Sequence, residues 1–175
     1  ADMVLVACKT SPDQAAAGVS LLIVPSSSEG FRRGRVLDKI GLKGQDTCEL
    51  FFNDVRVPKA NLLGQQGMGF IMLMKELAWE RLIIACLALG VIDFAIDETV
   101  RYVQDRKAFG QRVMDFQNTR FKLAECKTKA EVLRSFVSDC IARMDEGTLD
   151  AATASMAKYW GTQVQNEIAN ECLQL

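Results

Sequence analysis

The spacing of apolar residues changes near residue 60 and divides the chain into two kinds of structure. Before it, short apolar runs alternate with clusters of Gly, Pro, Ser and Asp, a pattern typical of strands joined by turns. Because so few strands barely bury a core alone, we expect antiparallel strands from part of a small barrel or sheet. The runs predict strands at 3–8, 19–24, 49–52 and 55–57, with turn clusters at 9–18, 25–34 and 41–46.

After Pro58 the chain has no proline, and its apolar residues recur every three or four positions, the period of a helix. A first helix is predicted from about Met68 to Phe109, with Gly110 as its stop signal. Asp115 is the expected N-cap of a second helix, and a third helix ends the chain. The apolar faces of these two helices consist of Leu123, Cys126, Ala130, Leu133, Val137, Cys140 and Met144, and of Met156, Trp160, Val164, Ile168, Cys172 and Leu175.

These patterns predict an α+β fold. We expect the later part of an antiparallel β-barrel at residues 1–62 and an antiparallel bundle of the four-helix type at residues 63–175. The first residue is Ala1 rather than Met, and the last helix ends in the middle of its apolar pattern. The chain is therefore expected to be a fragment of a longer protein, with a truncated bundle.

Composition and charge narrow the class of protein. The net charge is −1, from 21 Lys and Arg against 22 Asp and Glu, so nothing indicates a nucleic-acid partner. The longest apolar run, residues 82–92, is too short to span a bilayer. None of the six cysteines has CxxC spacing, which favours reduced thiols and a reducing compartment. There is no histidine, so the search for a base turns to carboxylates, and no metal site is predicted.

One carboxylate lies on an apolar stripe of the first predicted helix. In the segment KELAWERLIIACLALG, Glu80 shares its stripe with Leu73, Leu77, Ile84, Leu87 and Val91. It could be a structural residue, paired with Arg81 or Lys75 or reaching out to solvent. It could also be a buried base, since an apolar environment gives a carboxylate useful strength near neutral pH.

Three segments resemble the acyl-CoA dehydrogenase family. YVQDRKAFGQRVMDFQNTRFKLAE (102–125) resembles its C-terminal signature, and GLKGQDTCELFFNDVRVPKANLLG (41–64) resembles the end of its middle β-domain. GMGFIMLMKELAWERLIIA (67–85) resembles the first long helix of its C-terminal domain. The ERL segment and MAKYW (156–160) are most similar to the long-chain branch.

The resemblance implies a flavoenzyme of fatty-acid β-oxidation, usually a homotetramer, that converts fatty acyl-CoA thioesters to trans-2-enoyl-CoA. Glu80 would remove the α-proton, FAD would accept the β-hydride, and an electron-transfer flavoprotein would receive the electrons. The backbone N–H of Glu80 would also bind the thioester carbonyl. The expected location is a bacterial cytoplasm or a mitochondrial matrix.

The resemblance also assigns the other site residues. Ala78, Trp79 and Arg81 match positions that line the acyl-CoA site, although Arg81 could instead form a structural salt bridge. Arg106 and Gln117 match residues that reach the FAD of the neighbouring subunit, and Phe109 matches one that packs nearby. From spacing alone, Arg106 and Gly110 would be no more than a helix ending.

Two alternatives remain open at this point. An acyl-CoA oxidase would share the fold and the base but would let oxygen reach the reduced flavin. A non-catalytic helical interaction module is the alternative from another class. The basic cluster Arg32, Arg33 and Arg35 could touch CoA phosphates, but a solvated loop is the simpler interpretation.

Overall fold

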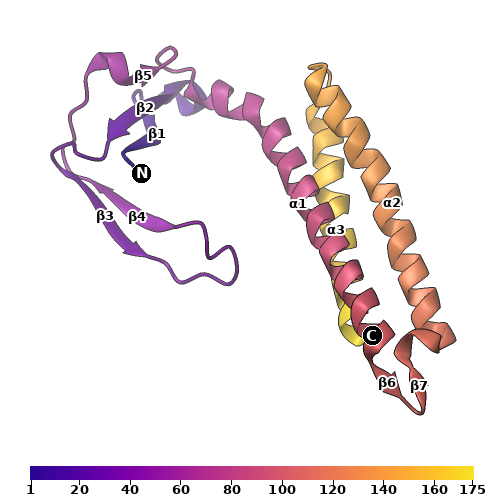
Figure 1. Ribbon diagram of the computed structural model, residues 1–175. Helices are drawn as coiled ribbons and strands as arrows, with labels where there is room; N and C mark the ends of the chain where they lie inside the picture. Colours follow the sequence, from indigo (N-terminus) through magenta and orange to yellow (C-terminus); the bar gives the residue numbers. More distant parts are fainter. The chain divides into compact units, whose positions relative to one another are not determined.

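The computed structural model describes residues 1–175, which divide into two compact units, Ala1–Met74 and Lys75–Leu175. The first unit is built mainly from strands and the second mainly from helices. Figure 1 shows this order in its colours, which run from indigo at the N-terminus to yellow at the C-terminus. The predicted α+β class, with antiparallel strands before antiparallel helices, is therefore confirmed. None of the helices contains an apolar segment of the length and hydropathy that a membrane span requires.

The first unit contains a three-stranded antiparallel sheet in the order β1–β2–β5. Strands β1 (Met3–Lys9) and β2 (Val19–Pro25) pair along their whole length, from Met3 opposite Pro25 to Lys9 opposite Val19. The short β5 (Leu62–Leu63) covers the other edge of β2, which supplies the buried residues of this sheet. Short 3-10 helices occupy Ala15–Gly18 and Lys59–Asn61.

A second pair of strands, β3 (Phe31–Val36) and β4 (Cys48–Phe52), forms a separate antiparallel hairpin. The strands therefore form separate small sheets and no closed barrel. The prediction of a turn over all of 25–34 was wrong, because the residues from Phe31 pair with β4 despite their arginines. The strand predicted at 55–57 is absent, because that segment pairs with no other strand.

The arginines of the basic cluster lie on β3 rather than in a solvated loop. The guanidinium of Arg32 lies 4.2 Å from the centre of the Phe51 ring, a distance typical of a cation–π contact. Arg33 donates a hydrogen bond of 2.9 Å to the carbonyl oxygen of Ala1. Two of the three arginines thus have partners within the first unit.

The beginning of the long helix is fixed against β2. The Gly67 N–H donates to the buried Ser20 hydroxyl oxygen at 2.9 Å, and that hydroxyl also bonds the Thr10 hydroxyl at 2.7 Å. A Cβ atom at Gly69 would lie 2.8 Å from the Ser20 backbone, so this close approach requires glycine.

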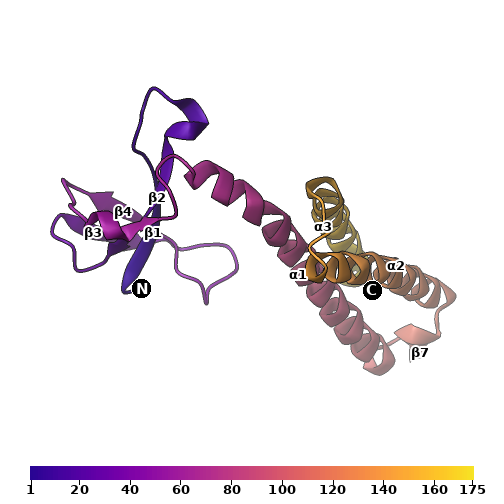
Figure 2. The ribbon, with the colours of Figure 1, turned by 90° about the horizontal axis from the view of Figure 1, so that it is seen from above.

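Three helices make up the second unit: α1 (Gly69–Asp105, which begins in the first unit), α2 (Gln117–Asp145) and α3 (Ala151–Gln174). They lie side by side in Figures 1 and 2. Ion pairs Lys122–Glu171 and Lys129–Glu167 join α2 to α3, and Arg134–Asp93 joins α2 to α1. The buried core consists of Leu82, Ala85, Leu89, Ile92, Ile96, Cys126, Ala130, Leu133, Val137, Cys140, Ala157, Val164 and Ile168.

The predicted apolar faces are confirmed in α2 and only partly in α3. All of the α2 positions from Leu123 to Cys140 are buried, and Met144 packs against the core. In α3 the predicted Met156 is exposed, and the small residues Ala154, Ala157 and Gly161 are buried in its place. All six cysteines are free thiols, and burial raises the pKa of Cys126 to about 11.

The first helix ends earlier than predicted, and Asp115 is not the cap of the second. Helix α1 stops at Asp105, and a small hairpin of β6 (Lys107–Ala108) and β7 (Gln111–Arg112) follows. Asp115 lies in a 3-10 turn (Val113–Asp115), and α2 begins after Phe116 without a side-chain cap. The carboxylate of Asp115 is held by Arg112 instead, which removes it from the capping position.

Helix α3 has a side-chain cap. Asp150 Oδ1 accepts hydrogen bonds from the N–H groups of Ala152 and Thr153 at 2.8 and 2.9 Å. The Thr153 hydroxyl donates to the other carboxylate oxygen at 2.6 Å. This hydroxyl, followed by the backbone donors, lowers the pKa of Asp150 below its ordinary 3.8.

We predict a pH-dependent first turn of α3. Because the folded pKa of Asp150 is lowered, its contribution is complete above the ordinary value and is lost as the pH falls through the lower folded value. Amide hydrogen-exchange protection of Ala152 and Thr153 should therefore fall as the pH is lowered below the ordinary carboxyl value of 3.8. Asp150→Asn keeps a capping oxygen but does not titrate, so its protection should depend far less on pH. Equal pH dependence in both proteins would contradict the assignment.

Candidate active site

Glu80 is exposed and unpaired. It lies in the first half of α1 but is absent from the core, and neither Lys75 nor Arg81 forms an ion pair with it. The alternative that Glu80 is a structural residue paired with Lys75 or Arg81 is therefore wrong. The expectation that Glu80 lies on a buried face was also wrong for this chain.

The geometry of α1 explains that error. The buried face passes through Ala85, and Glu80 lies about 140° round the helix from it at about 100° per residue. Helix α1 is apolar on two sides, and only one of them packs against α2 and α3. The predicted stripe follows the other side, where Leu87 is 61% exposed.

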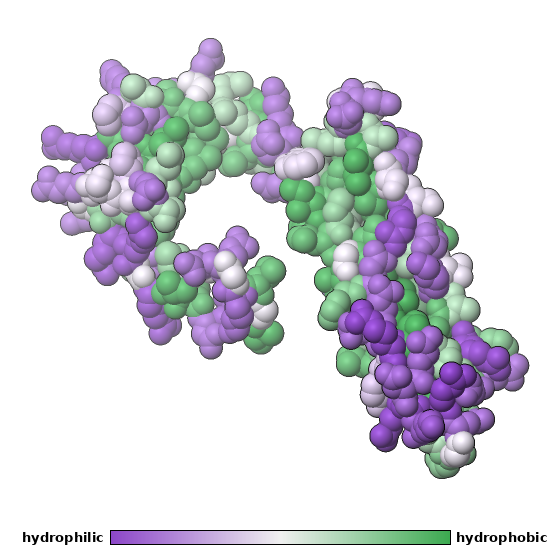
Figure 3. Space-filling model, in the orientation of Figure 1, coloured by the Kyte–Doolittle hydropathy of each residue, from purple (hydrophilic) through white to green (hydrophobic).

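The second apolar side of α1 places apolar side chains on both sides of the Glu80 carboxylate. Leu77 and Ile84, one turn to either side of Glu80, are half-buried, and Val91 and Phe94 further along are exposed. In Figure 3 hydrophobic residues line the α1 edge of the helical unit. Exposed apolar residues that form a continuous strip, as those from Leu77 to Phe94 do, are typical of a binding surface.

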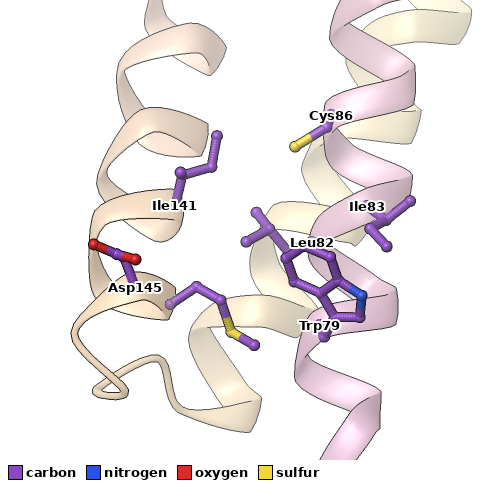
Figure 4. A pocket seen from close by; sticks show the side chains of 7 residues that line it. Trp79, Leu82, Ile83, Cys86, Ile141 and Asp145 are labelled. Atoms are coloured by element: carbon purple, nitrogen blue, oxygen red, sulfur yellow. The ribbon is translucent and has the colours of Figure 1, made fainter.

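A groove between α1 and α2 lies beside Trp79 but does not include Glu80. It encloses about 480 Å³, and Figure 4 shows the Trp79 ring beside Leu82 and facing the α2 side chains. Burial raises the pKa of the Cys86 thiol in this groove, so the thiol is neutral near pH 7. The lining residues are Trp79, Leu82, Ile83, Cys86, Ile141, Met144 and Asp145.

Two other predicted substrate residues flank Glu80 on α1. Ala78 and Arg81 are half-buried, whereas Trp79 is exposed over nearly half of its surface. Arg81 forms no ion pair, so the structural salt bridge that the sequence analysis considered for it is absent.

The backbone N–H of Glu80 is not free to bind a thioester. Residues 69–105 form one uninterrupted α-helix, in which each N–H bonds the carbonyl four residues earlier. The expectation that this N–H holds the substrate carbonyl was therefore wrong, because it assumed a backbone group that the helix already uses.

The predicted cofactor residues gather at the other end of α1, around the β6–β7 hairpin. The Arg106 N–H donates to the Tyr102 carbonyl at 2.8 Å, and the Arg106 carbonyl accepts from the Val113 N–H at 2.8 Å. The Arg106 backbone is thus held on both sides, while its guanidinium makes no ion pair. Gln117 is the first residue of α2 and is exposed.

Phe109 occupies the tip of this hairpin in an unusual conformation. Its φ is 51° and that of Gly110 is 83°, so both central residues of the two-residue turn are left-handed. A bulky residue in that region is strained and marks a local constraint. The Phe109 side chain is 98% exposed, although its ring lies edge-on to Phe116 with centroids 6.4 Å apart.

An ion pair that the sequence analysis missed stabilises the same region. Arg112 Nε donates to Asp115 Oδ2 at 3.1 Å, and Nη2 donates to Oδ1 at 2.9 Å. The hydrogen bond to Arg112 is the main cause that lowers the pKa of Asp115 below its ordinary value. The pair could have been predicted from the opposite charges of Arg112 and Asp115, which are three residues apart. It was missed because Asp115 was interpreted as a helix cap.

Comparison with known proteins shows the family of the chain. The family model for the acyl-CoA dehydrogenase C-terminal domain matches residues 67–175, and that for the middle domain matches residues 1–55. The mitochondrial long-chain specific acyl-CoA dehydrogenase of Rattus norvegicus is 47% identical over 99% of this chain and 41% of its own length. A subunit of the caffeyl-CoA reductase–Etf complex of Acetobacterium woodii is 36% identical over 99% of this chain and 46% of its own length.

A solved structure with the same fold is the acyl-CoA dehydrogenase of Geobacillus kaustophilus. It aligns with a TM-score of 0.95 at 44% identity, over 99% of this chain and 46% of that chain. The chain belongs to the acyl-CoA dehydrogenase family, whose members are FAD-dependent oxidoreductases. It spans less than half the length of the relatives it matches.

Proposed function

We propose that this chain is part of an FAD-dependent acyl-CoA dehydrogenase and that Glu80 is the catalytic base. The observation that carries the proposal is an unpaired, exposed carboxylate flanked by apolar residues on the side of α1 that does not pack against α2 and α3. The family match over residues 67–175 favours an enzyme over a helical interaction module. The experiments below use the full-length protein, the complete polypeptide of which this chain is proposed to be a part.

The chemistry follows from the position of Glu80. A carboxylate oxygen of Glu80 takes the α-proton of an acyl-CoA thioester, and the electrons of that C–H bond form the double bond of trans-2-enoyl-CoA. When bound, FAD would supply the acceptor for the hydride that leaves the β-carbon. The apolar neighbours Leu77 and Ile84 favour an acyl chain and disfavour water near the reacting carbon once the face is covered.

The substrate would be a long-chain acyl-CoA, lying along the face of α1 that carries Glu80. Support comes from the similarity to the rat long-chain enzyme and from the small side chain of Ala78, which leaves room for the chain. Trp79 and Arg81 would line the same site. This assignment places the full-length protein in fatty-acid β-oxidation.

Arg106, Phe109 and Gln117 would bind FAD through its diphosphate and adenosine part. The fit rests on an unpaired guanidinium just before the β6–β7 hairpin and an exposed amide at the start of α2, since a guanidinium binds a diphosphate with two parallel hydrogen bonds. Glu80 and Arg106 are 26 residues apart, which corresponds to about 39 Å along a helix. We therefore infer that the two act on different copies of FAD, in an oligomer such as a homotetramer.

Replacing Arg106 by Gln should weaken FAD binding by about tenfold or more, because a charged partner of the diphosphate is lost. The measurement is the FAD dissociation constant of the full-length protein by fluorescence titration. Arg101→Gln is the matched control, since Arg101 lies just over one turn earlier on α1 and is paired with Glu98. Equal FAD affinities in the two variants would reject this cofactor site.

A second direction of reaction is supported by one relative. The Acetobacterium woodii protein is a subunit of a caffeyl-CoA reductase–Etf complex, and the same base could return a proton to the α-carbon of an enoyl thioester. We propose that the full-length protein likewise exchanges electrons with an electron-transfer flavoprotein. Comparing flavin reduction by acyl-CoA with flavin oxidation by enoyl-CoA decides which direction the protein favours.

A further inference from the structure

The Arg112–Asp115 pair lies between the two polar residues of the proposed FAD site. Arg106 precedes the β6–β7 hairpin and Gln117 follows it, so the ten residues between them decide how the two side chains are placed. Those residues include Phe109 and Gly110, both with positive φ, and contain no α-helix. Such a connection needs tertiary bonds to hold one shape.

Two hydrogen-bonded links connect the hairpin region to the segment before α2, in addition to the edge-on contact of the Phe109 and Phe116 rings. One is the backbone hydrogen bond from the Val113 N–H to the Arg106 carbonyl at 2.8 Å. The other is the two-pronged contact between Arg112 of β7 and Asp115 of the 3-10 turn. Of these two hydrogen-bonded links, only the second uses side chains, and its two parallel bonds fix direction as well as distance.

We propose that Arg112 and Asp115 are positioning residues, which hold Arg106 and Gln117 in the arrangement that receives the diphosphate of FAD. The proposal rests on the function proposed above. Neither residue is required to touch the cofactor. Asp115 also occupies the guanidinium of Arg112, so that Arg106 remains the unpaired arginine at this hairpin.

A purely electrostatic role and a positioning role of this pair predict opposite changes in FAD affinity. An anion such as a diphosphate is repelled by a nearby carboxylate, so removing the Asp115 charge should tighten FAD binding if only electrostatics mattered. If the pair positions the site, the same substitution should weaken binding. Both side chains are about half exposed, so the pair contributes little to global stability.

The test compares FAD dissociation constants of the full-length protein and its variants. Asp115→Asn and Arg112→Gln should each weaken FAD binding by about 2- to 5-fold, as expected for an exposed pair. The double variant should lose no more FAD affinity than either single variant, because the two residues act as a unit. Arg112→Lys keeps the charge but not the two-pronged geometry, and it should also weaken binding.

Asp139→Asn is the matched control, because it breaks the exposed Arg143–Asp139 pair near the other end of α2. It should leave FAD affinity unchanged, and all variants should keep the melting temperature of the wild type within a few degrees. Unchanged or tighter binding in Asp115→Asn would overturn the positioning role. If Arg106→Gln weakens binding and Asp115→Asn does not, only this inference fails; if neither does, the proposed cofactor site fails with it.

Discussion

Replacing Glu80 by Gln in the full-length protein should slow flavin reduction by acyl-CoA by about 10²- to 10⁴-fold, the usual contribution of a general base. Glutamine is nearly the same size as glutamate but cannot accept the α-proton. Because Glu80 is exposed and outside the core, the substitution should leave folding and FAD binding intact. The measurement is anaerobic stopped-flow absorbance of the flavin after mixing with a long-chain acyl-CoA.

Glu76 provides the matched control for this prediction. It lies one turn before Glu80 on the same side of α1 and is also exposed. Glu76→Gln removes the same charge at nearly the same place, so it should keep most of the rate. Similar losses in both variants would show that the effect is one of general charge near the substrate. A normal rate in Glu80→Gln would mean that the base is another group.

Replacing Leu133 by Ala should destabilise the helical unit by about 2 to 5 kcal/mol, the usual cost of deleting a buried leucine side chain. Leu133 is 0% exposed and lies in the core where α1, α2 and α3 meet. Its side chain also lies 3.6 Å from the position of a Cβ on Gly161, so the space it leaves is bounded by α3. The measurement is chemical denaturation followed by helix circular dichroism.

The neighbouring residue gives the control for that prediction. Val132 is 53% exposed, so Val132→Ala should change the free energy of unfolding by no more than about 0.5 kcal/mol. Comparable losses for Leu133→Ala and Val132→Ala would contradict the assignment of the core face of α2.

The helices were predictable because α2 has one apolar face and a strict period, so its buried residues could be named from the sequence. Helix α1 has apolar residues on two sides, and periodicity alone could not tell which side packs against α2 and α3. The same limit applies to the strands. Phe31–Val36 carries three arginines and pairs with β4, whereas 55–57 has a strand-like pattern and no partner.

The structure of the hairpin region could not be predicted from the spacing of residues alone. The sequence marked Gly110 as the end of a helix, but the left-handed conformation at Phe109 is a property of the closed turn. Asp115 has the residue type of an N-cap, but it lies one residue before Phe116, which holds the cap position, and its carboxylate bonds Arg112 instead. The family resemblance named Arg106 and Gln117, and the structure supplied the pair that lies between them.

The most direct test of the central claim isolates proton removal from hydride transfer. An acyl-CoA analogue with sulfur in place of the β-carbon keeps an acidic α-proton but has no β-hydrogen to transfer. The full-length protein with FAD bound should exchange the α-proton of this analogue with deuterium from solvent, as measured by mass spectrometry. Glu80→Gln should bind the analogue and exchange no faster than free solution, whereas wild-type exchange in Glu80→Gln would contradict the account.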